Sequence, residues 1–245
     1  MARLLKQLRE APRACSYLPG TRASLDHRLM LDVSPAELDW LLAHGWRRFG
    51  PDYFRPACPA CSACVPTRLP VADFAATRSQ RRARRKATGL RVTVGPPRVD
   101  EERLALYRLW HADREEAREW SPSALDADDY AMQFAFPHPC AREVTLHDDD
   151  AGGRLVGVSI CDEAPEAWSL VYFFYDPAYA ERSLGVANVV IGVEIAAARG
   201  IPYVYLGYAV AECPSLKYKQ AFGPREELLG WPPGSEEPRW VRTGG

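Results

Sequence analysis

The chain has 245 residues, of which 47% are hydrophobic, with seven tryptophans and a formal net charge of −1. This is enough apolar material to bury a sizeable core, and we expect one mixed domain with a smaller N-terminal part. No apolar segment follows the polar N-terminal residues, and no uninterrupted apolar run reaches about eighteen residues. The composition therefore excludes a signal peptide and a membrane span, and predicts a cytoplasmic protein with no membrane partner.

A helix start is the first clear local signal. Ser34 can act as the N-cap, Pro35 occupies the first helical position, and Glu37 completes a capping box. We expect this helix to end near Gly45, followed by an aromatic and basic segment over residues 46–54.

Three cysteines follow that segment at two-residue gaps: Cys58, Cys61 and Cys64. The chain has seven cysteines, an odd number that suits reduced thiols or metal ligands better than a secreted disulfide framework. With Cys15 as a fourth ligand, the group can hold zinc in a tetrahedral thiolate site or an iron–sulfur cluster. The alternative is a reduced cysteine cluster that packs without metal, since the short gaps crowd three ligands.

A run of positive charge comes next, over residues 78–86. Six of its nine residues are cationic, and the pattern predicts an exposed helix that stops near Gly89 before a strand over 90–94. A solvated helix face is the ordinary explanation, but no acidic residue is interleaved to support the helix. We therefore predict contact with a polyanion. The cations are Arg78, Arg81, Arg82, Arg84, Arg85 and Lys86.

The organisation of the chain changes near residue 95. Residues 1–95 form an N-terminal subdomain with the cysteine loop and the basic helix, and residues 96–245 form a second domain of helices followed by a sheet. The elements expected there are helices over 101–118 and 127–135, a hairpin of strands over 154–161 and 167–175, a helix over 186–199 and a strand over 203–208. The fold class is α/β (α+β).

A turn between the hairpin and the last helix is a candidate anion site. Its residues include Arg182, Ser183 and Gly185, and it places unpaired backbone N–H groups and a helix dipole beside one another. The sequence Arg-Ser-Leu-Gly-Val-Ala at 182–187 resembles the turn with which GCN5-related acetyltransferases hold the pyrophosphate of an acyl carrier. An ordinary turn and helix start is the alternative.

An ordered set of motifs closely resembles a known family, the bacterial aspartate/glutamate leucyltransferases, relatives of the eukaryotic arginyl-tRNA–protein transferases. The match spans roughly residues 15–230. The motifs are Cys-Ser-Tyr-Leu-Pro at 15–19, Gly-Trp-Arg-Arg-Phe-Gly-Pro-Asp-Tyr-Phe-Arg-Pro at 45–56, the cysteine run with Val-Pro-x-Arg at 65–68, Arg-Ser-Gln-Arg-Arg at 78–82, Tyr-Phe-Phe-Tyr-Asp-Pro at 172–177, Ser-Leu-Gly at 183–185, Tyr-Leu-Gly-Tyr at 205–208 and Tyr-Lys at 218–219. Two departures concern the acceptor pocket: Ser215-Leu216 stands where the family has Lys-Met, and residues 107–125 fit the family pattern poorly.

The resemblance implies a GCN5-related N-acyltransferase-like fold with a smaller N-terminal, cysteine-containing subdomain. It implies transfer of leucine from leucyl-tRNA to proteins that begin with Asp or Glu, which marks them for N-end rule degradation. The basic run and the turn at 182–185 become tRNA-binding, and no cofactor is required for transfer. Related eukaryotic enzymes have cysteines that bind a metal or a cluster, and this resemblance is the argument for a metal at Cys15, Cys58, Cys61 and Cys64, while the remoteness of Cys15 in sequence and the crowded gaps keep the metal-free cluster open.

The chemistry requires no covalent nucleophile, because an aminoacyl ester is already activated towards an amine. We expect Tyr175, Asp176, Tyr205 and Tyr208 to lie at the ends of the strands that flank the anion turn, with a carboxylate or phenol as proton relay. The ordinary alternative is that Asp176 terminates a strand and that the tyrosines are core and edge residues.

Four cations are candidate partners for the acidic acceptor side chain, because a buried carboxylate needs charge-assisted hydrogen bonds. They are Arg47, Arg48, Arg55 and Lys219. Three other functions stay open: an arginyl-tRNA–protein transferase with the same acceptors, a CoA-dependent N-acetyltransferase, and a non-enzymatic nucleic-acid-binding module.

Overall fold

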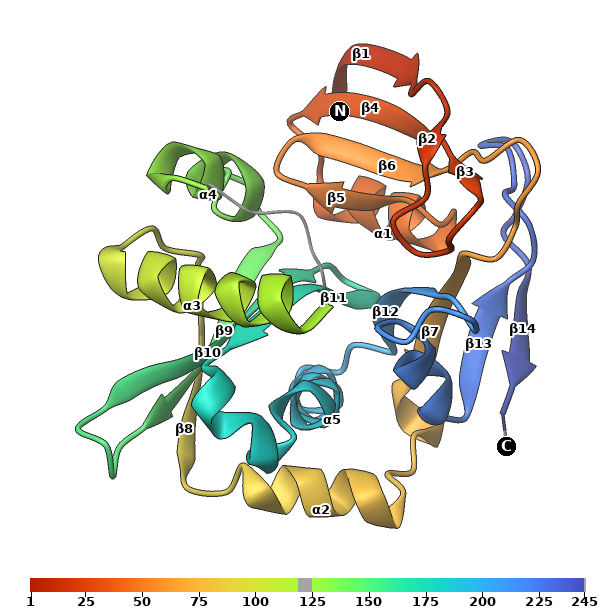
Figure 1. The fold of residues 1–245 in the computed structure, drawn as a ribbon. Coiled ribbons are helices and arrows are strands. Elements are labelled where there is room, and N and C mark those ends of the chain that lie inside the picture. The colour runs from red at the N-terminus through yellow and green to blue at the C-terminus, as the bar shows by residue number, and fades with distance from the viewer. Residues whose placement is uncertain (119–124, 245) are drawn as a thin grey trace.

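The computed structural model describes residues 1–118 and 125–244, and contains two sheets and a short two-stranded ribbon (Figure 1). The smaller sheet has four strands in the order β1-β4-β6-β5, and the larger has eight in the order β14-β13-β7-β12-β11-β10-β9-β8. One neighbouring pair in the large sheet, β11 and β12, is parallel, and the other six neighbouring pairs are antiparallel. The protein is therefore a mixed α/β protein with a large mixed sheet, which confirms the predicted class.

The four-stranded sheet is built from the first 56 residues and lies at the top of Figure 1. Its strands are β1 (Arg3–Arg9), β4 (Leu25–Leu31), β5 (Arg47–Phe49) and β6 (Asp52–Pro56), and β2 (Arg13–Ala14) pairs with β3 (Arg22–Ala23) beside it. The helix α1 (Pro35–Ala43) has the predicted capping box, with Ser34 as N-cap. The aromatic and basic segment after α1, which the sequence left without an assigned structure, forms the β5–β6 hairpin.

Two strands from the first 95 residues pair within the large sheet. After β7 (Val65–Pro70), the chain forms η1 (Val71–Asp73), the basic helix α2 (Arg78–Lys86) and β8 (Leu90–Gly95). β7 lies between β13 and β12, and β8 forms one edge of the sheet beside β9. The expected change of organisation near residue 95 falls immediately after β8.

The second part of the chain supplies the rest of the large sheet. Its helices are α3 (Glu101–Arg118), α4 (Ala127–Phe134) and α5 (Leu184–Ala198), with 3-10 turns η2 (Pro177–Arg182) and η3 (Lys217–Ala221). Its strands are β9 (Ala141–Asp148), β10 (Arg154–Glu163), β11 (Ala167–Tyr175), β12 (Tyr203–Ala209), β13 (Arg225–Leu228) and β14 (Trp240–Thr243). The antiparallel pairing of β10 with β11 confirms the predicted hairpin. Among the helices of the described residues, none combines the length and apolar character needed to cross a bilayer.

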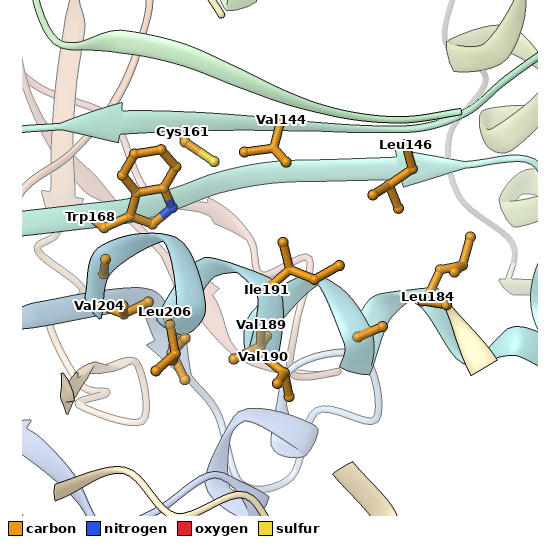
Figure 2. Packing of buried hydrophobic residues seen from close by; sticks show 14 of the residues in the cluster. Val144, Leu146, Cys161, Trp168, Leu184, Val189, Val190, Ile191, Val204 and Leu206 are labelled. Carbon is orange, nitrogen blue, oxygen red and sulfur yellow. The ribbon is translucent and has the colours of Figure 1, made fainter. Parts of the chain in front are cut away.

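Helices cover both faces of the large sheet. Successive residues of β11 point to opposite faces, so Phe174 enters the cluster around α3, whereas Tyr175 enters the cluster around α5. Figure 2 shows the second cluster, in which Ile191 of α5 points towards Val144 of β9, whereas Val190 lies on the opposite side of the helix. The mostly apolar sequence of α5 follows from this position between the sheet and α2.

The two parallel strands separate soon after they begin. β11 and β12 are paired from Ala167 with Tyr203 to Ser169 with Tyr205, and no further pairs join them. Beyond this point β12 follows β7 with a bulge between Tyr205 and Gly207, while β11 runs on towards the start of α5. Beyond the separation, the C-terminal half of β12 is paired with β7 and that of β11 is paired with β10.

Candidate functional site

The basic helix α2 lies on the surface of the molecule beside α5. Thr77 and Gln80 form a capping box at its start, and the Gln80 Nε2 also donates a hydrogen bond to the carbonyl of Ala221 at 2.9 Å. Gln80 and Ala83 are buried, which directs the opposite side of the helix to solvent. The uncharged residues of α2 thus pack against the protein, and its cations lie on the solvent-facing side of the helix.

The cations of α2 differ in whether they already have a hydrogen-bond or salt-bridge partner within the protein. Arg84 pairs with Glu194 of α5 at 2.9 Å, Arg81 donates to the carbonyl of Ala76, and Lys86 donates to the carbonyl of Glu181 at 2.6 Å. Within the described part of the chain, the remaining three arginines have no hydrogen bond or salt bridge. These exposed residues are Arg78, Arg82 and Arg85.

The predicted anion turn lies at the end of the same helix, because the bond from Lys86 to Glu181 joins α2 to η2. Ser183 has φ 57° and ψ 43°, a left-handed conformation, and its side chain does not cap α5. The first N–H groups of a helix have no acceptor within it, and the space beside Gly185 is open to at least 4 Å from an added Cβ. Arg182 lies next to this turn, 3.7 Å from the Asp148 carboxylate. The structure therefore brings the two predicted anion-binding groups together.

The four predicted catalytic residues fall into two groups with different surroundings. Asp176 is 2% exposed, caps η2 through a 2.9 Å bond from the Ala178 N–H, and pairs with Arg154. Tyr175 packs against Trp110, with ring centroids 4.4 Å apart. These contacts give Asp176 the strand-terminating and capping role that was the ordinary alternative for it.

The other two tyrosines lie on β12 and belong to the side of the molecule that carries the four-stranded sheet. Tyr208 donates to the carbonyl of Gly45 at 2.9 Å, and burial raises its pKa. The Tyr205 hydroxyl accepts a hydrogen bond from Arg68 at 3.0 Å. Both rings face the guanidinium of Arg47, whose carbon is 5.3 Å from the Tyr205 ring centre and 5.5 Å from that of Tyr208.

The four predicted acceptor-binding cations do not form one group. Arg48 is buried and paired with Asp162 of β10, and Arg55 lies over Trp46 and donates to the carbonyl of Pro232 at 3.1 Å. Arg47 and Lys219 are the two that come together, because both lie within 4 Å of a Cβ atom placed on Gly207. The structure thus separates two structural arginines from a pair of cations at the tyrosines of β12.

Two residues of this region were missed as site residues. Arg68 of β7 joins Glu226 at 2.7 Å, the Tyr205 hydroxyl, and the ring of Tyr203, whose centre is 3.7 Å away. Gly207 has φ 81° and occupies the bulge of β12. A glycine inside a strand pattern indicates a bulge or the close approach of another group. The bulge at Gly207 could therefore have been predicted from the sequence.

The predicted cysteine ligands gather around one pocket. Cys15, Cys58, Cys61 and Cys64 all line it, together with Tyr208 and Trp231. Burial, followed by the charges of the neighbouring thiols, raises the pKa of Cys64 to about 12. Among the residues that the structure describes, no group of three or more Cys, His, Asp or Glu side chains could hold a metal ion. The thiols therefore do not fit zinc or an iron–sulfur cluster in this arrangement.

Comparison with known proteins identifies the class of protein. A family described as arginine-tRNA-protein transferase matches the chain in two parts, its N terminus over residues 13–82 and its C terminus over residues 102–229. The chain belongs to this family, which confirms both the predicted family and the predicted enzyme class, an aminoacyltransferase. The predicted anion turn at 182–185 lies within the second matched segment, whereas the first matched segment ends inside α2, at residue 82.

Individual relatives are similar over most of their length. An aspartate/glutamate leucyltransferase of Methylorubrum populi is 37% identical over 234 residues, covering 90% of this chain and 93% of the relative. The protein of the same name from Chromobacterium violaceum is 36% identical over 222 residues, with 90% and 89% covered. Among solved structures, FemX superposes with a TM-score of 0.49 at 9% sequence identity, covering 87% of this chain and 84% of that one.

Proposed function

We propose that the protein transfers leucine from leucyl-tRNA to the N-terminal α-amine of proteins beginning with Asp or Glu, marking them for N-end rule degradation in the cytoplasm. The observation that carries the proposal is the match to relatives named aspartate/glutamate leucyltransferase over about nine tenths of both chains. The family description, which names arginine, supports a second candidate, an arginyl-tRNA–protein transferase with the same acceptors.

The surface of α2 and the start of α5 are suited to the tRNA donor. Three unpaired arginines on α2 offer phosphate contacts, and Arg182 continues this charge to the N-terminus of α5. The separation of β11 from β12 beside that helix supports a GCN5-related N-acyltransferase-like arrangement, in which the acyl group enters between the two strands. In this proposal Ser183 and Gly185 receive the phosphate nearest the acylated end of the tRNA.

The reaction is an aminolysis of the ester that joins leucine to the tRNA. The neutral α-amine of the acceptor attacks the ester carbonyl, the new C–N bond forms, and the bond to the ribose oxygen breaks. An α-amine has an ordinary pKa of about 7.7–8.0, so a useful neutral fraction exists near neutral pH. The proton that the attacking nitrogen loses is taken up by the departing ribose oxygen. All atoms and protons are therefore accounted for without a covalent enzyme intermediate or a cofactor. The acceleration comes from positioning the amine against the ester carbonyl.

The tyrosines of β12 are proposed to shape the site where the amine meets the ester. The Tyr205 and Tyr208 hydroxyls are held by Arg68 and by the carbonyl of Gly45, so their rings are fixed in place. We assign them the positioning of the acceptor. Asp176 is proposed to hold η2 and thereby the donor turn, through its bonds to Ala178 and Arg154.

The test is transfer of radiolabelled amino acid from Leu-tRNA and, separately, from Arg-tRNA to peptides that differ only in an N-terminal Glu, Asp, Lys or Ala. We expect leucine transfer confined to the Glu and Asp peptides. Arginine transfer to the same peptides would replace the donor by the second candidate, and transfer from neither would overturn the proposed function.

A further inference from the structure

Arg47 is a buried arginine whose charge has no anionic partner. The residue is 7% exposed, and its Nη1 donates to the carbonyl of Trp46 at 2.7 Å. Its Nε and Nη2 atoms are buried and have no hydrogen-bond partner among the described residues. The carboxylate whose charge acts on Arg47, that of Asp162, is already paired with Arg48. Because buried polar groups without partners are costly, these two N–H groups point to a ligand.

A second cation faces the same place. Lys219, on η3, directs its Nζ to the carbonyl of Tyr208 at 3.0 Å and forms no salt bridge with any residue that the structure describes. Burial and the charge of Arg47 lower the pKa of Lys219 to about 7. Two neighbouring cations that lack an anion repel each other, so an anion bound between them would stabilise both.

Gly207 lies at the point that both cations approach. A Cβ atom added to this glycine would lie 3.3 Å from Lys219 Nζ and 3.9 Å from Arg47 Nε, and these are the two contacts within 4 Å beyond its chain neighbours. One atom at this position can therefore touch both cations. The left-handed backbone of Gly207, with φ 81°, is a conformation that residues with a side chain rarely adopt, which keeps the space free.

We propose that Arg47, Lys219 and Gly207 form the binding site for the side-chain carboxylate of the acceptor's N-terminal Asp or Glu. This proposal rests on the proposed function and deepens it by placing the acceptor specificity at one pair of cations. Nε and Nη2 lie along one edge of a guanidinium, which is the geometry that donates to both oxygens of a carboxylate. Lys219 then contacts one of these oxygens from the side of Gly207.

A carboxylate suits this site better than a phosphate of the tRNA. Arg47 is almost fully buried, its guanidinium faces the rings of Tyr205 and Tyr208, and the point that both cations reach lies beside a single glycine. A backbone phosphate carries a ribose on each side, whereas a side-chain carboxylate is a planar group at the end of a narrow stem. Lys219 is half-buried as a residue, whereas Arg47 is buried.

The experiment measures binding of two amidated tripeptides, Glu-Ala-Ala and Gln-Ala-Ala, by isothermal titration calorimetry with the whole protein. Because the C-terminus is amidated, the peptides differ in one carboxylate. We expect the wild type to bind the Glu peptide about ten to a hundred times more tightly, the range for a paired, charge-assisted contact. R47Q should abolish this preference, R47K should keep part of it, and K219M should reduce it by about tenfold.

The matched control is R28Q. Arg28 is a half-buried arginine that forms no salt bridge with the described residues and whose Nε, like that of Arg47, is buried without a partner among them; its guanidinium carbon lies 4.3 Å from the ring centre of Trp46. The proposal expects R28Q to keep the wild-type preference. Equal binding of both peptides by the wild type, or an unchanged preference in both R47Q and K219M, would overturn it. K219M keeps the test decisive if R47Q does not fold, because Lys219 is not part of the buried core.

Separate measurements distinguish this proposal from the proposed function. Wild-type protein that prefers the Glu peptide but transfers neither leucine nor arginine would overturn the function and leave the carboxylate site standing. Binding of uncharged tRNA should be the same for wild type and R47Q. A loss of tRNA binding with an unchanged peptide preference would assign the cations to a phosphate and overturn the carboxylate site.

Discussion

Arg48 of β5 and Asp162 of β10 form a buried ion pair that joins the four-stranded sheet to the eight-stranded sheet. Their side chains are 7% and 1% exposed, and Arg48 also donates to the carbonyl of Gly50 at 3.0 Å. Arg48 therefore has hydrogen-bond partners for its guanidinium within the protein. Its neighbour Arg47 has two N–H groups, Nε and Nη2, without a partner among the described residues. This pair holds β5 in place and thereby fixes the position of the unpaired guanidinium beside Tyr205 and Tyr208.

The first prediction concerns this pair. Replacing Arg48 with Met leaves the Asp162 carboxylate buried without a partner, which should lower the free energy of unfolding by about 3–5 kcal/mol. Replacing both residues, as R48M with D162L, should recover most of that loss because no buried charge remains. Urea unfolding followed by tryptophan fluorescence measures both values. Equal stabilities of R48M and the double variant would contradict the buried-charge explanation.

The second prediction concerns the free arginines of α2. Changing Arg78, Arg82 and Arg85 to alanine should weaken tRNA binding and lower the slope of log K against log salt by about two to three, one contact for each arginine. Filter binding at several salt concentrations gives the slope. R91A is the matched control, because Arg91 is an exposed arginine already paired with Asp149 at 3.0 Å. An unaltered slope in the triple variant would remove α2 from the tRNA-binding surface.

Local signals predicted the helices and the hairpin well, because their causes lie within a few residues. The capping box at Ser34 defines the start of α1, and the charge pattern of 78–86 gives the bounds of α2. The strand β1 escaped prediction because all of its residues are exposed, so no alternation of apolar and polar residues marks it. Its pairing with β4 depends on backbone hydrogen bonds rather than on burial.

The site was predictable as a set of residue types but not as an arrangement. Arg47 and Arg48 are adjacent and chemically identical, and their roles differ because the partner of one, Asp162, is 114 positions away. The place of β7 between β12 and β13 likewise depends on strands that begin more than 130 residues later. Such long-range pairings have no signature in the local sequence, so only the fold could show which cations stay unpaired.

The third prediction concerns His138 and acid. Burial, and then the charge of Arg48, lower the pKa of His138 to about 3. Its Nδ1 accepts from the Cys140 N–H at 3.1 Å, and its Nε2 lies 3.0 Å from the Tyr53 hydroxyl, so a proton added at Nδ1 would face another donor. In the unfolded chain His138 binds a proton near its ordinary pKa of about 6.5. The unfolded state therefore holds more protons between these two values, and stability should fall as pH falls through this window.

The measurement for His138 is the free energy of unfolding of wild type and H138Q at pH values between about 4 and 7. The wild type should lose up to about 1 kcal/mol per pH unit more than H138Q, close to the limit for a single proton. H27Q is the control, because His27 lies beside Asp52 at 3.0 Å near the surface and not in this buried contact. Parallel curves for wild type and H138Q would show that His138 does not carry the acid sensitivity.

The fourth prediction concerns Gly185 at the start of α5. A methyl group added here meets no atom within 4 Å, and the residue has an ordinary backbone conformation, so G185A should fold and gain about 0.5–1 kcal/mol of stability. The same methyl group occupies the open space that the proposed donor phosphate needs, and we expect KM for leucyl-tRNA to rise several-fold. Steady-state kinetics with each variant measures this rise. G95A is the matched control, since Gly95 also has open space and an ordinary conformation but lies at the end of β8. If G185A and G95A gave the same KM as the wild type, the donor would not be bound at the start of α5.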